Sequence, residues 1–238
     1  MMRIDILTLF PEMLASTLET SIIKRAQDAG HVEIFVHDIR DWADNKHRKV
    51  DDRPFGGGPG MVLMCQPLHD AVLAVERQSE LPARRVYFTP QGEVLKQERV
   101  EQLANEQHLL LIAGHYEGID ERVIESLEPL ELSTGDYVLS GGELPALLLV
   151  DAVVRVLPGV LGHADSAEQD SFSLRDDEGN RLLDCPHYTR PRVWNEKEVP
   201  EVLLSGDHGA VDQWRMEQMK QRTESRRPDL RDNEEVDP

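Results

Sequence analysis

The sequence contains little cysteine, no long apolar run and few basic residues relative to acidic ones. Cys65 and Cys185 form neither a CxxC pair nor a cluster with histidine, which excludes a disulfide framework and a zinc site. No apolar run approaches the ~20 residues of a membrane span, and the apolar N-terminus lacks the basic flank of a signal peptide. We therefore expect a protein of the reducing cytoplasm, with no membrane partner.

Acidic side chains far outnumber basic ones, with 45 Asp and Glu against 26 Lys and Arg and a formal net charge of -19. This balance argues against a nucleic-acid partner, because phosphates are neutralised by Lys and Arg. Two explanations would reconcile it with such a partner. Either the charge is unevenly distributed over the surface, or the acidity is a trait of a whole salt-adapted proteome.

Strands and helices are expected to alternate along the first part of the chain, a pattern typical of an α/β fold with a parallel sheet. The expected strands cover residues 3–9, 32–37, 85–88, 109–113 and 130–133. The expected helices cover residues 10–29, 66–77, 94–105, 119–126 and 144–157, of which the last is nearly apolar all round and therefore buried. Residues 158–186 show no periodicity and predict an inter-domain linker, followed by a helix at 211–222 and an acidic tail.

Three turns that follow predicted strands have a similar composition, at residues 87–92, 114–118 and 134–142. Ligands of open α/β sheets bind beyond the carboxyl ends of the strands. None of the turns is a phosphate loop of the GxxxxGKS, GxxxxGKT or GxGxxG kind, which disfavours ATP and NAD. Glycines, aromatic rings and proline with few charges suit an uncharged adenine and ribose.

The pair Gly141–Gly142 lies between an apolar run and a predicted helix start at Glu143 or Leu144. Glycine permits backbone angles that other residues avoid and lets a ligand approach the backbone closely. The free N–H groups of the helix start add donors for a ligand. An ordinary strand–turn–helix corner is the alternative interpretation of the pair on its own.

A series of longer motifs extends over nearly the whole chain. They are DDRPFGGGPGM at 51–61, PQG at 90–92, GHYEGIDER at 114–122, GDYVLSGGELPA at 135–146, PGVLG at 158–162, DSF at 170–172 and LLDCPHYTRP at 182–191. Together they resemble the bacterial tRNA (guanine-N1)-methyltransferase (TrmD) family. Motifs of this length in this order are far more specific than any single short pattern.

The resemblance implies a SPOUT-like fold, in which the parallel sheet contains a deep trefoil knot, with a small C-terminal helical domain. It implies a catalytic domain at 1–160 that binds S-adenosylmethionine, a linker at 161–186 with the catalytic aspartate, and a tRNA-binding domain at 187–238. The reaction implied is methyl transfer to N1 of the guanosine immediately 3′ of the anticodon, at tRNA position thirty-seven. Members of the family act as homodimers with a shared active site.

The cofactor-binding residues that the resemblance implies come from the three turns and the helix start after them. They are Tyr87, Phe88, Thr89, Pro90, Gln91, Gly114, Tyr116, Glu117, Gly118, Thr134, Gly135, Asp136, Tyr137, Val138, Leu139, Gly141, Gly142 and Pro145. As structural alternatives, the tyrosines would be core residues and Glu117 would be a helix-start carboxylate.

The implied catalytic pair is Asp170 in the DSF motif and Arg155 near the end of the apolar helix. The acceptor nitrogen has a proton, so a base is required, and a guanidinium beside guanine O6 would stabilise the charge left as the proton leaves. A normal carboxylate is a weak base and would need desolvation or a more acidic substrate. The ordinary alternatives are a solvated aspartate and a helix-capping arginine.

The implied tRNA contacts are His47, Arg48, Arg53, Arg215 and Arg222. A Mg²⁺ requirement is left open, since the sequence contains no ligand cluster. His115 replaces an arginine usual in the family, and residues 173–181 are longer and more acidic than expected. The rival interpretations are a knotted methyltransferase that acts on a ribose hydroxyl, and a catalytically inactive RNA-binding protein.

Overall fold

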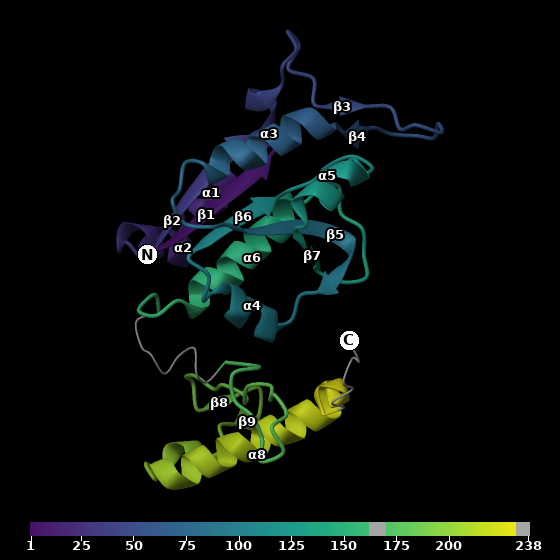
Figure 1. Cartoon of the computed structure of the whole chain (residues 1–238). Helices are drawn as coiled ribbons and strands as arrows, with labels where there is room; N and C mark the ends of the chain where they lie inside the picture. Colours follow the sequence, from purple (N-terminus) through teal and green to yellow (C-terminus); the bar gives the residue numbers. More distant parts are fainter. Residues whose placement is uncertain (162–169, 232–238) are drawn as a thin grey trace. The chain divides into compact units, whose positions relative to one another are not determined.

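The computed structural model describes residues 1–161 and 170–231, and the chain divides into two compact units, Met1–Leu161 and Gly162–Pro238 (Figure 1). The expected acidic tail lies largely in residues 232–238, outside the described residues. Among the described residues, no helix is both long enough and apolar enough to cross a membrane.

A five-stranded sheet in the order β2-β1-β6-β5-β7 forms the centre of the first unit. All its neighbouring strands pair in parallel, which confirms the expected α/β architecture. The strands are β1 (Met2–Thr8), β2 (Val32–Asp38), β5 (Arg84–Val94), β6 (His108–Ile112) and β7 (Leu130–Ser133). Because β6 is buried on both faces, its continuous apolar run LLLI fits a central parallel strand.

Helices cover both faces of this sheet, and each face has its own hydrophobic core. One core is packed by α1 (Pro11–Leu18), α2 (Ser21–Asp28), α4 (Gln97–Leu103) and α6 (Glu143–Val156). The other is packed by α3 (Cys65–Glu76), α5 (Glu121–Leu127) and the short η1 (Ile39–Trp42). Alternate residues of one strand enter different cores, as Val86 and Tyr87 do.

Two expectations about the first unit were wrong in detail. The single helix expected at 10–29 is two helices, because the Thr20 hydroxyl bonds the carbonyls of Ser16 and Thr17 and Ser21 has a φ of 51°. The turn expected at 89–92 lies within β5, where the pairing with β7 shifts between Phe88 and Glu93. A bulge of this kind re-aims the strand without ending it.

The loop between η1 and α3 is not featureless. Strands β3 (Asp51–Asp52) and β4 (Val62–Leu63) pair in antiparallel fashion and bracket the glycine-rich segment. The end of this loop is fixed to the turn after β6, because Glu117 N donates to Met61 O at 3.0 Å and Leu63 N donates to Gly118 O at 3.0 Å.

The second unit is organised around the long helix α8 (His208–Arg226). Its other elements are the hairpin strands β8 (Val193–Trp194) and β9 (Lys197–Glu198), and the short helices η2 (Glu201–Leu204) and η3 (Pro228–Leu230). The described part of the segment expected as a linker, 170–186, packs on α8: Leu182 and Cys185 are buried with Met219. Leu183 N also donates to the buried Thr223 hydroxyl at 2.8 Å.

Candidate functional site

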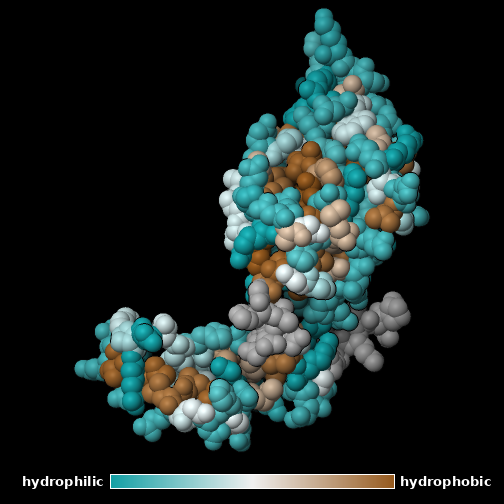
Figure 2. All heavy atoms as spheres, turned by 90° about the vertical axis from the view of Figure 1, so that its left-hand side faces the viewer, coloured by the Kyte–Doolittle hydropathy of each residue, from teal (hydrophilic) through white to brown (hydrophobic). Residues whose placement is uncertain are grey.

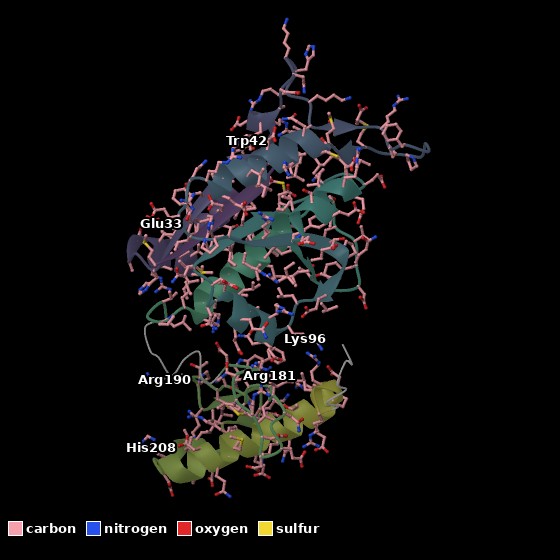
Figure 3. The ribbon with its side chains drawn as sticks, in the orientation of Figure 1. Glu33, Trp42, Lys96, Arg181, Arg190 and His208 are labelled. Carbon is pink, nitrogen blue, oxygen red and sulfur yellow. The ribbon has the colours of Figure 1, made fainter. Side chains whose placement is uncertain are left out.

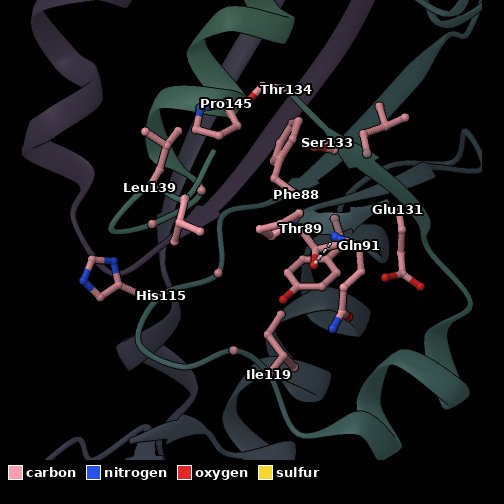
Figure 4. Close-up of a pocket in the computed structure, with 18 of the residues that line it drawn as sticks. Phe88, Thr89, Gln91, His115, Ile119, Glu131, Ser133, Thr134, Leu139 and Pro145 are labelled. Atoms are coloured by element: carbon pink, nitrogen blue, oxygen red, sulfur yellow. Dashed lines mark hydrogen bonds between the residues drawn. The ribbon is translucent and has the colours of Figure 1, made fainter. Parts of the chain in front are cut away.

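A cavity of about 450 Å³ opens at the carboxyl ends of β5, β6 and β7 (Figure 4). Its walls come from residues 87–91 at the bulge of β5, from β7, from the turns after β6 and β7, from α5 and from the start of α6. Since the strands are parallel, their carboxyl ends meet at one edge of the sheet, where open α/β folds bind ligands. The volume lies in the range of small-molecule sites, about 300–1,000 Å³.

The structure brings most of the expected cofactor residues together around this cavity. Those that line it are Tyr87, Phe88, Thr89, Pro90, Gln91, Gly114, Tyr116, Glu117, Gly118, Thr134, Tyr137, Val138, Leu139, Gly141, Gly142 and Pro145. Gly135 and Asp136 are not among the lining residues. Which ligand the cavity holds stays a prediction.

Eight further lining residues were not among the expected cofactor residues, although two of them, His115 and Ser140, lie in the expected turns: His115, Ile119, Glu121, Ile124, Glu131, Leu132, Ser133 and Ser140. Glu131 lies between Leu130 and Leu132 in strand β7, and a charge at this position was a recognisable indication. Glu121 and Ile124 belong to α5, and their contribution depends on how that helix packs. In Figure 4, His115 and Glu131 lie on opposite sides of the cavity.

The charge of the cavity wall is one-sided. The lining includes Glu117, Glu121 and Glu131 but no lysine, arginine or aspartate. Burial, together with the nearby Glu131, raises the pKa of the Tyr87 hydroxyl, and burial likewise raises the pKa of Tyr116. Both phenols therefore stay neutral at physiological pH, so the ionisable groups favour a cationic ligand over an anionic one.

The glycine pair is required for close packing rather than for unusual backbone angles. Gly142 has an ordinary φ of −83°, but a Cβ there would lie 2.7 Å from Ala113 Cα and 2.9 Å from Gly114 N. Gly142 N donates to Gly114 O at 2.7 Å, so two turns of the cavity wall meet backbone to backbone. A Cβ on Gly92 would similarly lie 2.5 Å from the backbone of Glu131.

A buried carboxylate supports this wall from behind. Glu143 is 1% exposed, and its Oε1 accepts a hydrogen bond from Thr8 Oγ1 at 2.8 Å. Its Oε2 lies 3.7 Å from Nδ1 of His115, beyond hydrogen-bond distance. The His115 ring also contacts Phe10, with 4.8 Å between ring centroids. The histidine that replaces the expected arginine is therefore enclosed by aromatic and acidic neighbours.

The expected catalytic residues lie in different units. Arg155 is exposed in the last turn of α6 in the first unit. Asp170 is half-buried in the second unit, where its carbonyl accepts from Ser173 N at 3.1 Å. Nearby, Phe172 has a φ of 73°, and Asp184 N donates to the Ser171 hydroxyl at 3.0 Å. The DSF segment is thus fixed within its own unit.

The expected tRNA contacts are also divided between the units. His47, Arg48 and Arg53 are exposed in the loop between η1 and β3 and just after β3, and the Arg48 guanidinium bonds Asp41. Arg215 lies on α8 with Asp212 at 3.5 Å, and Arg222 is half-buried with Nη1 3.5 Å from Asp184 O. Among residues 1–161 and 170–231, no group of three or more His, Cys, Asp or Glu is arranged to hold a metal ion.

The fold and the cavity define an α/β protein with a cavity of small-molecule size at the carboxyl edge of a parallel sheet. Residues 2–233 match the family described as tRNA (Guanine-1)-methyltransferase TrmD. The chain belongs to this family of methyltransferases.

Its curated relatives agree over nearly the whole length. A tRNA (guanine-N(1)-)-methyltransferase of Pseudomonas putida is 52% identical over 229 residues, which cover 96% of this chain and 89% of the relative. The enzyme of the same name from Pseudomonas fluorescens has the same identity and coverage. That of Pseudoalteromonas atlantica is 52% identical over 94% of this chain and 83% of its own length.

Proposed function

We propose that this protein transfers a methyl group from S-adenosylmethionine to N1 of the guanosine immediately 3′ of the anticodon of tRNA, at position thirty-seven. The observation that supports this most is the cavity at the carboxyl edge, whose walls are built from the family's own motifs. The relatives named as tRNA (guanine-N(1)-)-methyltransferases support the choice of substrate.

The residues around the cavity fit the proposed methyl donor. S-adenosylmethionine, when bound, supplies a methyl group on a positively charged sulfonium. Glu117, Glu121 and Glu131 would favour this positive charge, and the lining contains no lysine or arginine to repel it. Phe88 and Pro145 offer apolar surface for an adenine ring, and the close backbones at Gly142 and Gly114 offer polar groups at its edge.

Within the proposed reaction, this chain's own groups handle one proton and one developing charge. Asp170 accepts the proton from guanine N1, and Arg155 stabilises the negative charge that develops on guanine O6. A planar guanidinium suits this second task because its N–H groups are fixed in direction.

We further propose a knotted sheet and a homodimer with a shared active site. In each active site, Asp170 of one subunit would act together with Arg155 of the other subunit. Close backbone passage of 141–142 beside 113–115 supports the knot. Leu144 and Leu148, one turn apart on α6, are 55% and 46% exposed and would be covered in a dimer. Figure 2 shows apolar side chains gathered on the viewed face of this unit.

We propose that His47, Arg48, Arg53, Arg215 and Arg222 contribute to tRNA binding. The first four are exposed, which is consistent with this role, whereas Arg222 is half-buried. A cytoplasmic location suits the substrate and the two free cysteines.

The decisive experiment incubates the protein with isotopically labelled S-adenosylmethionine and tRNA transcripts that have guanosine or adenosine at the proposed position. We expect label at N1 of that guanosine and none in the adenosine transcript. Label on a ribose hydroxyl would favour the rival ribose methyltransferase. Binding of tRNA without any transfer would favour an inactive RNA-binding protein.

A further inference from the structure

The second unit has one segment whose charge departs sharply from the rest of the chain. Residues 187–195 (HYTRPRVWN) contain no acidic residue, although the whole chain has 45 of them. All residues from 187 to 198 are exposed in the structure. Figure 3 labels Arg190 at the margin of this unit.

The β8–β9 hairpin separates its side chains by charge. Val193 pairs with Glu198 and Trp194 pairs with Lys197. Directly opposite residues of an antiparallel pair share a face, and residues two apart on one strand do so as well. Arg192, Trp194 and Lys197 therefore share one face, here called the hairpin face, whereas Val193 and Glu198 occupy the other.

The hairpin face combines an exposed ring with two available cations. Trp194 is 66% exposed, which is more than any other phenylalanine, tyrosine or tryptophan within residues 170–231. Within residues 170–231, Arg192 and Lys197 have no ion pair or side-chain hydrogen bond. Several other basic residues of this unit are engaged; Lys220, for example, pairs with Asp177 at 3.0 Å.

The backbone holds this face in a fixed form. Val199 N donates to Arg192 O at 3.0 Å and closes the hairpin at its base. The tight turn has Asn195 and Glu196 at φ of 49° and 60°, and a left-handed conformation at Glu196 is uncommon for a residue other than glycine. A preformed exposed ring binds a flat partner at a low cost in conformational entropy.

We propose that the hairpin face binds an unpaired nucleotide of the tRNA, with the base stacked on Trp194 and the adjacent phosphates contacted by Arg192 and Lys197. Every base has a π-face, and stacking on an aromatic ring next to basic side chains is a general mode of single-strand binding. The inference rests on the proposed function for the tRNA substrate. It adds a contact site that the family motifs did not indicate.

The test measures binding of the full-length protein to a tRNA transcript and to a fully paired RNA duplex of similar length. Trp194→Ala should raise the Kd for the tRNA about 5- to 150-fold, whereas Trp194→Phe, which keeps a ring, should stay within about threefold of wild type. Val193→Ala on the opposite face is the matched control and should bind as wild type does.

The cations are tested by salt dependence. The double variant Arg192→Gln with Lys197→Gln should lower the slope of log Kd against log salt by about 1.4 for single-stranded contacts. Glu198→Gln removes a charge from the opposite face and should leave this slope unchanged. An unchanged slope in the double variant would overturn the phosphate contact.

Wild-type tRNA affinity in Trp194→Ala would overturn the proposal, as would an equal loss of affinity for the paired duplex in this variant. A change in the oligomeric state of Trp194→Ala in sedimentation would also overturn it, because the face would then be a protein interface. Its failure is distinguishable from failure of the proposed function. Methyl transfer by the wild-type protein tests the function, whereas the difference between Trp194→Ala and Val193→Ala tests the hairpin face.

Discussion

In the first unit, aliphatic side chains fill both faces of the sheet, whereas the buried cluster of the second unit's described part consists of Leu182, Cys185 and Met219. In the second unit, hydrogen bonds add to this small buried cluster. Those of Thr223, Ser171 and Phe172 link residues 170–186 to α8 and to one another. The first unit thus provides a stable wall for a cavity. The second places polar and aromatic groups on a scaffold with a small core.

If the two units divide the chemistry, removing the base should spare the cofactor cavity. Asp170→Asn should lower kcat about 1,000-fold, as expected for loss of a general base, with cofactor affinity nearly unchanged. Single-turnover kinetics and calorimetry measure these two quantities. Loss of cofactor binding in this variant would show that Asp170 contributes to the cofactor cavity and would contradict its role as the general base.

Arg155 tests the contribution of the first unit to the same reaction. Arg155→Lys keeps the charge but loses the planar fork, so kcat should fall about 100-fold. Arg25→Lys, an exposed substitution on α2, serves as the control and should leave kcat unchanged. A normal turnover for Arg155→Lys would contradict the role proposed for the guanidinium.

The core of the first unit contains a buried polar cluster around Asp5. Burial on its own raises the pKa of the Asp5 carboxyl, but hydrogen bonds with His108, His37 and Arg3 outweigh it and hold that pKa well below its usual range. The folded pKa lies below the unfolded value of about 3.9, so the stabilisation is complete above that pH. It is lost as the pH falls from there toward the folded pKa.

Asp5→Asn should therefore lower the free energy of unfolding at pH 7 by about 2 kcal/mol, with the difference from wild type shrinking below about pH 4. Urea unfolding at several pH values measures this. Asp28→Asn, which removes a partner of an exposed pair with Lys24, is the control and should change stability by less than about 1 kcal/mol. A difference independent of pH would argue against the ionised Asp5.

The smallest expected effect concerns the hydrogen bonds of the second unit. Thr223 is fully buried, accepts from Leu183 N at 2.8 Å and donates to Met219 O at 2.8 Å. Thr223→Val should destabilise this unit by about 1 kcal/mol because the Leu183 amide loses its partner, whereas Thr223→Ser should retain most of the stability. Hydrogen exchange of the amides at 182–185 reports the loss. Equal protection in both variants would mean that packing, and not the hydroxyl, holds this segment.

Sequence patterns predicted the first unit well because its strands and helices follow local periodicity. β6 is a continuous apolar run, and α6 begins at Glu143 as expected after the glycine pair. The break at Thr20 was not predictable from periodicity, because the pattern continues across it while side-chain hydrogen bonds end α1. Local order was therefore easier to predict than its interruptions.

The cavity was predicted from the turns, but its charge was not. Glu121 and Glu131 enter the wall through the packing of α5 and the position of β7, which no motif spacing encodes. Residues 170–186 were expected as a linker because they are acidic and aperiodic. Their order depends on Leu182 and Cys185 meeting Met219 of α8, a contact between distant parts of the sequence.

The bond between Thr8 and Glu143 joins residues 135 positions apart, and β1 pairs with β6 as well as with β2. The first strand can pair with β2 early, whereas its other neighbour β6 and the Glu143 carboxylate exist only after most of the first unit has been synthesised. Contacts at such separations form slowly, since a long loop must close before they are made. During synthesis, the wall behind the cavity is among the last parts of this unit to assemble, so a nascent chain that stops before α6 lacks the buried Glu143 carboxylate and the part of the cavity wall at Pro145.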